Sequence, residues 1–270
     1  MKLREIIVDA IKYPISDIRK FLIFCALIIL MSLSTVLPSY GVKDSTLSLI
    51  LTLVTLIVVF IVLGYSMDVI KGGTEGDDTL PDFDYVKNFV MGIKAFILNL
   101  IYLIIPLVIV IIIASATGLF SSLTEIVNVG INSLANETTN VTNVTTIIAS
   151  VPKSTMNTFT NALSITVTAG IILFIIFSFL AFTAQVRFAK TGSGTEGLRF
   201  REILRDISKV GFIKIIVTLI VTYIIALAMV FVIGLIGLIP YIGVFIGIFV
   251  GMPFVILYLY RSIGLLYADA

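Results

Sequence analysis

The residues that could do chemistry gather in two short charged stretches. Positions 72–84 hold five carboxylates, and carboxylate oxygens are the ligands that hard cations prefer. Their spacing fits no calcium-binding loop, so we expect a solvated loop in which Asp82 caps the following helix. The second stretch is basic and consists of Arg199, Arg201, Arg205 and Lys209. We expect it to contact anionic lipid headgroups, and contact with the acidic loop is the alternative.

Few residues in the sequence could support catalysis or bind a cofactor or metal ion. The chain has no histidine and a single cysteine, Cys25, so zinc, haem and Cys–His catalysis are not expected. No nucleophile with a basic partner and no phosphate-binding glycine loop is present. The net charge of +2 says little about partners, and no nucleic-acid partner is expected. The sequence therefore predicts a protein that is not an enzyme and holds no cofactor or metal ion.

The composition is typical of an integral membrane protein. Of the 270 residues 59% are hydrophobic, and the mean hydropathy is +1.17. Several apolar runs exceed about 18 residues, which is enough to cross a hydrocarbon core of roughly 30 Å as a helix. Because the runs are continuous rather than alternating, we predict an all-α, six-helix membrane bundle forming one domain, 1–270. The expected spans are 21–37, 47–67, 95–114, 164–185, 212–234 and 241–260.

A short amphipathic segment recurs ahead of three of these spans. The clearest copy is Leu3–Lys12, and 200–209 matches it at Arg, Glu, Ile, Asp and Lys. The stretch 83–92 is a degenerate third copy. Apolar residues spaced at i, i+3, i+4 and i+7 give each clear copy one apolar and one charged face. Such a helix suits the membrane–water interface or the flank of a neighbouring helix.

These copies predict an internal repeat. The sequence Gly-Thr-Glu-Gly also occurs twice, at 73–76 and 194–197, each time after a span. We expect three parallel units, each an amphipathic helix followed by one helix out and one helix back. Convergent composition of the helices beside the membrane is the alternative. The expected units are 1–71, 83–190 and 199–270.

The basic residues predict the orientation, because cytoplasmic loops retain Lys and Arg. With the N-terminus inside, all but Lys43 and Lys153 of the 18 basic residues fall on the cytoplasmic side. We therefore expect a multi-pass cell-membrane protein with both termini cytoplasmic and an outer loop at 115–162. Apolar residues at helical spacing between 119 and 134 predict a helix along the outer face. Three glycosylation sequons, which chance could also produce, fall in the same loop at Asn136, Asn140 and Asn143.

Two further sets of residues lie within the spans. Neutral polar side chains occur at Asn99, Tyr102, Thr222 and Tyr223. They could line a solute path, but hydrogen bonds between helices are the favoured interpretation. Glycines recur at Gly243, Gly247 and Gly251. This small-xxx-small pattern predicts close helix packing, either within the chain or with a second copy.

Several motifs together resemble a known family. They are the segment 1–12, Gly64-Tyr65, Lys71, Gly76-Asp77, Leu80-Pro81-Asp82-Phe83, Gly92, Arg187-Phe-Ala-Lys190, Phe200-Arg-Glu-Ile203 and Gly264-Leu-Leu-Tyr267. Over nearly the whole chain they resemble an uncharacterised, mainly archaeal family of polytopic membrane proteins, DUF4013. The chain departs from that pattern at Asp68, where a basic residue is usual, and in lacking Trp after Phe83. The resemblance implies membrane location and an archaeal source, but no activity.

The function expected from these observations is structural. A scaffold or assembly component of the cell envelope comes first, with membrane lipids and a second copy or another membrane protein as partners. The alternative is a channel or facilitator for a small neutral solute or lipid. A sensor that reads anionic lipids through its amphipathic helices comes third.

Overall fold

The computed structural model describes residues 1–39, 41–42, 44–136, 148, 150–239 and 242–268. These residues form helices joined by short turns and contain no strand, which confirms the all-α prediction. Six helices are long and apolar enough to cross a membrane. They are α2 (Ile18–Ser39), α3 (Ser45–Glu75), α4 (Tyr85–Ala116), α7 (Lys153–Thr191), α9 (Phe212–Gly237) and the stretch Gly247–Leu266 that contains α11 (Met252–Leu266).

The helices run further than the apolar runs that predict them. At 1.5 Å per residue, α7 with its 39 residues is roughly 58 Å long, well beyond a hydrocarbon core of about 30 Å. The copy at 83–92 is not a separate helix, because most of it forms the first turns of α4. No proline separates this segment from the apolar run, so the helix continues through both. The last of the six apolar stretches begins with a π-helical turn, Gly247–Gly251, which follows the short α10 (Ile242–Ile246).

The other two amphipathic copies are separate short helices, α1 (Leu3–Lys12) and α8 (Phe200–Val210). Tyr13–Ile15 forms a 3-10 turn containing Pro14, so α1 ends where proline predicts. Asp17 then caps α2, accepting a hydrogen bond from the Lys20 amide at 3.1 Å. Of the two environments expected for α1, the structure shows the flank of neighbouring helices.

The apolar face of α1 packs on α11, in a cluster that also includes a residue of α9. Ile6 and Ala10 are fully buried, in one cluster with Ala226, Val255 and Tyr258. The first helix is therefore fixed by contacts along its length rather than only by its connection to α2.

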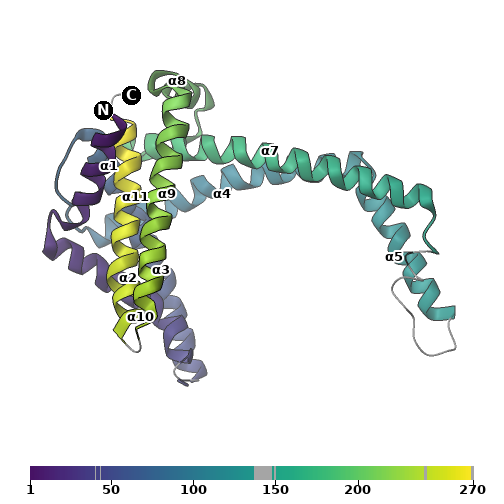
Figure 1. Ribbon diagram of the computed structural model, residues 1–270, viewed down its shortest axis with the longest axis horizontal. Coiled ribbons are helices and arrows are strands. Elements are labelled where there is room, and N and C mark those ends of the chain that lie inside the picture. Colours follow the sequence, from purple (N-terminus) through teal and green to yellow (C-terminus); the bar gives the residue numbers. More distant parts are fainter. Residues whose placement is uncertain (40, 43, 137–147, 149, 240–241, 269–270) are drawn as a thin grey trace. The chain divides into compact units, whose positions relative to one another are not determined.

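The chain divides into two compact units. The first comprises Met1–Asn99 and Leu180–Ala270, and the second comprises Leu100–Phe179. Within the first unit, α1, α8 and the end of α11 lie at one end, and α10 lies at the other (Figure 1). We call the end that carries Asp9, Arg187 and Arg261 the charged end.

The second unit contains the C-terminal part of α4 and the N-terminal part of α7 together with α5 (Leu119–Asn136). The helix expected between 119 and 134 is thus present. Thr155 of α7 donates a hydrogen bond to Glu125 of α5 at 2.8 Å. The apolar side chains Phe120, Val127 and Ile131 of α5 are exposed. This leaves α5 with an apolar face that the described residues do not cover.

Candidate functional site

The acidic stretch after α3 has a defined conformation. Gly76 ends α3 with φ +80°, a left-handed conformation that suits glycine, and the Asp77 amide donates to the Gly72 carbonyl at 2.9 Å. Leu80 is then buried, and its carbonyl accepts a hydrogen bond from Lys20 Nζ at 2.7 Å. The loop is therefore held against α2, although several of its carboxylates remain in solvent.

Aromatic packing fixes the other side of this loop. The rings of Tyr65 and Phe83 are stacked, with centroids 4.0 Å apart and planes at 3°. The Tyr65 hydroxyl donates to the Pro81 carbonyl at 3.2 Å. These contacts give a physical reason for the Tyr65 and Leu-Pro-Asp-Phe motifs.

Asp82 does not cap α4, contrary to the sequence prediction. Asp84 accepts the hydrogen bond of the Lys87 amide at 3.0 Å and is the cap. Asp82 instead pairs with Lys20, at 2.9 Å between Nζ and Oδ1. The hydrogen bond and charge of Lys20 lower the pKa of Asp82.

Arg261 is the most buried charged residue at the charged end. Its side chain is only 1% exposed, and its Nε donates to Asp9 Oδ1 at 2.8 Å. Its other nitrogens reach the Asp77 carbonyl and, at 3.4 Å, the Asp78 carboxylate. The guanidinium carbon lies 4.3 Å from the centre of the Tyr13 ring, a cation–π contact. One side chain of α11 thus joins α1, the 3-10 turn and the acidic loop.

Tyr13 lies beneath this guanidinium and is itself buried. Its hydroxyl donates to the Thr79 carbonyl at 3.2 Å. Burial raises the pKa of Tyr13 to about 12, despite the opposing effect of the Arg261 charge. The phenol is therefore neutral over the physiological range.

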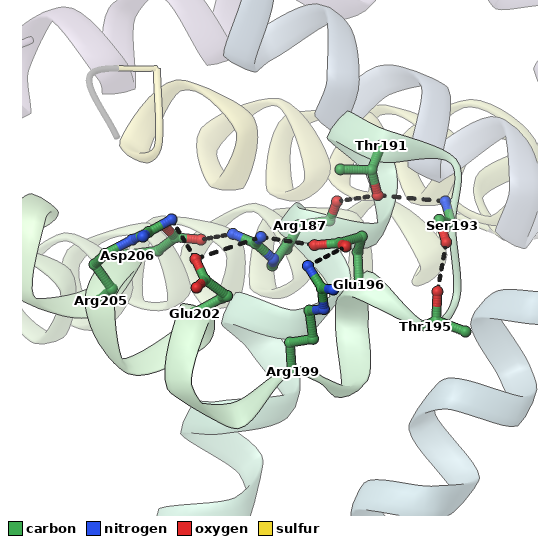
Figure 2. A network of polar contacts seen from close by, with 9 residues as sticks. All are labelled: Arg187, Thr191, Ser193, Thr195, Glu196, Arg199, Glu202, Arg205 and Asp206. Carbon is green, nitrogen blue, oxygen red and sulfur yellow. Dashed lines mark hydrogen bonds and ion pairs between the residues drawn. The ribbon is translucent and has the colours of Figure 1, made fainter.

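Arg187, near the end of α7, is the centre of a second cluster (Figure 2). Its Nη1 lies 2.8 Å from Asp206 of α8, and its Nη2 lies 2.7 Å from Glu196. Glu202 is further away, at 3.7 Å from Nη2. The guanidinium therefore ties α8 and the turn before it to the end of α7.

Asp68, near the end of α3, forms a third cluster with the opposite sign. It is 7% exposed and accepts hydrogen bonds from Lys87 Nζ at 3.0 and 3.2 Å. Asn88 Nδ2 donates to the same carboxylate at 2.7 Å. The residue that departs from the family pattern is thus compensated by two side chains of α4.

The four basic residues predicted to contact lipid are all exposed at the protein surface. Arg199 pairs with Glu196 at 2.8 Å, and Arg205 pairs with Glu202. Neighbouring carboxylates therefore offset part of the positive charge of α8, which also carries Arg201 and Lys209. In the ion pairs described here, the acidic loop binds Lys20 and Arg261 rather than α8.

The neutral polar residues of the spans lie in different settings. Asn99 accepts a hydrogen bond from Gln185 of α7 at 2.6 Å, as expected for a contact between helices. Thr222 is buried, and its hydroxyl lies near the buried hydroxyl of Tyr258 on α11. Tyr223 is 55% exposed on α9. Tyr102 is buried and belongs to the second unit.

The three glycines of the small-xxx-small pattern face α9. A Cβ on Gly243 would overlap the Ile236 carbonyl, and one on Gly251 would lie 2.6 Å from Ile233 Cγ1. A Cβ on Gly247 would lie 3.0 Å from Ile233 Cγ2. The structure thus uses these glycines for packing within the chain. Gly247 and Gly251 also line an apolar groove of about 500 Å³ beside α9.

A second glycine crossing was not predicted from spacing. A Cβ on Gly64 would overlap the Asn88 carbonyl, and one on Gly92 would overlap the Phe60 carbonyl. Glycine therefore allows the backbones of α3 and α4 to touch. Both residues belong to the motifs that carry the family resemblance.

The glycosylation sequons and the question of a metal site remain. Asn140 and Asn143 lie outside the described residues, as does the side chain of Asn136. In the part of the chain that the structure describes, no three Cys, Asp or Glu side chains converge as a metal site would require.

The Arg261 cluster is the feature that sequence reasoning missed. Asp9 and Arg261 are 252 residues apart, and no local pattern links positions so distant. The usable signal was a lone charged residue in a mostly apolar helix, which needs a partner if it is buried.

Comparison with known proteins is consistent with this description. No curated protein matches the chain, and no solved structure matches it. One family model matches residues 47–263, most of the chain, and its description is "Protein of unknown function (DUF4013)". The chain therefore belongs to the DUF4013 family of proteins of unknown function.

Proposed function

We propose that this protein is a non-enzymatic scaffold of the cell envelope that binds a membrane protein or a second copy of itself. The observation that carries the proposal is that the buried and half-buried charges bind other helices of the same chain. Asp68, Arg187 and Arg261 all form ion pairs that join one helix to another. Charges paired in this way select which helices meet and take no part in chemistry, as a scaffold requires.

The spans offer surface for such a partner. In the most apolar window of α7 only 11% of residues are buried, and in that of α4 only 17%. Exposed isoleucines such as Ile112 and Ile175 lie along these helices in the second unit. A spanning helix gains packing energy from another helix that lipid does not supply fully. These surfaces therefore suit association with other spans.

The proposed orientation places both termini and the charged end in the cytoplasm. The distribution of Lys and Arg supports it, since only Lys43 and Lys153 would lie outside. The sequons at Asn136, Asn140 and Asn143 would then face the outside, where glycosylation occurs. Membrane lipids would contact the exposed basic residues of α8 from the inner leaflet.

Photo-crosslinking in native membranes tests the scaffold. A photoreactive amino acid at Ile175, which is 65% exposed, is compared with one at Phe24, which is fully buried. We expect protein adducts at Ile175 and none at Phe24. Adducts to lipid alone at Ile175 and at Ile112 would contradict the proposal.

The second candidate is a facilitator for a small neutral solute or lipid. The observation that favours it is the pair of buried hydroxyls of Thr222 and Tyr258 within the spans, because neutral polar groups in such a place can bind water or a small ligand. Purified protein in liposomes would then admit a neutral solute such as glycerol, and Thr222→Val would slow its entry. Entry no faster than in empty liposomes would remove this candidate.

A further inference from the structure

The three ion-pair clusters share one arrangement of elements, although the charges in the Asp68 cluster are reversed. In each, a charged side chain near the end of a returning helix binds an amphipathic segment. Asp68 of α3 binds Lys87 and Asn88 in the segment 83–92. Arg187 of α7 binds Asp206 of α8, and Arg261 of α11 binds Asp9 of α1.

The two arginine contacts correspond residue by residue. Asp9 lies six positions after Leu3, and Asp206 lies six positions after Phe200, so both occupy the same place in matching segments. In both contacts a guanidinium nitrogen lies 2.8 Å from the carboxylate oxygen. The same position therefore makes the same bond in two parts of the chain.

The order of these contacts is cyclic. The helices α3 and α7 each bind the amphipathic segment that follows them in the sequence. The helix α11 binds the first segment, α1. We propose that the three repeat units close into a ring at the charged end, and that α1 is the clasp that completes it.

Contacts between the returning helices support this arrangement. A Cβ on Gly73 of α3 would lie 2.8 Å from the Gly264 Cα of α11, so their backbones touch. The hydroxyls of Tyr267, just after α11, and Thr183 of α7 lie 2.7 Å apart. The C-terminal part of α11 therefore contacts α3 and α7, the other two returning helices, and α1 packs against side chains of α11.

The closing contact depends on Asp9. With Arg261 only 1% exposed, loss of the Asp9 carboxylate leaves a buried cation poorly compensated, which is strongly destabilising. Arg187 is 16% exposed and has Glu196 as a second close partner. Neutralising Asp9 should therefore release its helix more readily than neutralising Asp206.

Cysteine accessibility in purified protein tests the clasp. In a Cys25→Ala background, Ile6→Cys places a thiol at a fully buried site of α1, and Val8→Cys places one at a site 43% exposed. We expect Asp9→Asn to speed maleimide labelling of Ile6→Cys at least tenfold and to leave Val8→Cys unchanged. Asp206→Asn should accelerate labelling of Ile6→Cys far less.

A cysteine at Ile203, fully buried in α8, separates release of α1 from general unfolding. It should stay protected in Asp9→Asn. If it too becomes reactive, Asp9→Glu decides, because a clasp held by the carboxylate requires Ile6→Cys to stay more protected in Asp9→Glu than in Asp9→Asn. Unchanged labelling of Ile6→Cys in Asp9→Asn, or equal labelling in Asp9→Glu and Asp9→Asn, would overturn the proposal. Neither outcome depends on whether a partner protein is found.

Discussion

Arg261 shows how one residue can organise sequence-distant segments. Its guanidinium reaches a carboxylate of α1 and a carbonyl of the acidic loop, and it lies over the Tyr13 ring. A lysine would not replace it, because its compact ammonium lacks the planar fork whose separate nitrogens reach different acceptors while the group lies on a ring. The contacts of this residue explain why the chain tolerates a buried charge in an otherwise apolar helix.

Tyr13 makes a prediction about pH at this site. Its folded-state pKa is about 12, above the ordinary value of about 10, so folding favours the neutral phenol. The stability it contributes is complete below about pH 10 and is lost as the pH rises toward 12. The ultraviolet difference titration between the parent and Tyr13→Phe should show a tyrosinate forming near pH 12. Ionisation of that residue near pH 10 would contradict its burial.

The sequence predicts some individual residues and not others. Local sequence allows Ser16 or Asp17 to cap α2, because a cap needs only the residues of the next turn, and the structure shows Asp17 in that role. The cap at Asp84 was misassigned to Asp82, since both precede the helix and only the Lys20 contact separates their roles. The partners of Arg261 were not foreseeable, because they depend on helices that meet only in the folded chain.

At the scale of elements, the crossing of α3 and α4 gives a prediction. Alanine at Gly64 would push its Cβ into the Asn88 carbonyl, so the helices must separate. We expect Gly64→Ala to destabilise the protein by about 1–3 kcal/mol, as overpacking typically does. Gly234→Ala is the matched control, because nothing lies within 4 Å of that position. Thermal unfolding in detergent compares them, and equal midpoints would contradict a close crossing.

The spans themselves were readable from sequence because continuous apolar runs leave few alternatives in a bilayer. Helix ends were not, since α3 and α7 continue past their apolar cores into polar sequence that is still helical. The merging of 83–92 into α4 has the same cause. Close backbone contacts such as Gly64 with Asn88 were missed, because spacing alone does not say which helices meet.

At the scale of the molecule, the proposed ring predicts that the chain can be permuted. A short linker from residue 270 to residue 1, with new ends at Gly192, would place α1 directly after α11. In the same way, the segment 83–92 follows α3 and α8 follows α7. A Cβ added at Gly192 would meet nothing within 4 Å, so this turn has open space and the opening should be tolerated.

The permuted chain should insert into membranes and protect Ile6→Cys from maleimide as the parent does. The control is a chain opened within α9, at Gly234, which should fail to fold because it interrupts a span. A Gly192 permutant that inserts but leaves Ile6→Cys reactive would contradict the ring, because α1 would then fail to pack when it directly follows α11.

The central claim is that six helices cross the membrane with the charged end inside. Cysteines at Lys209, on α8, and at Lys153, at the start of α7, test it in a Cys25→Ala background, because both sites are exposed. Membrane-impermeant maleimide should label Lys209→Cys only in inside-out vesicles and Lys153→Cys only in right-side-out vesicles. Labelling of both cysteines from the same side would contradict it.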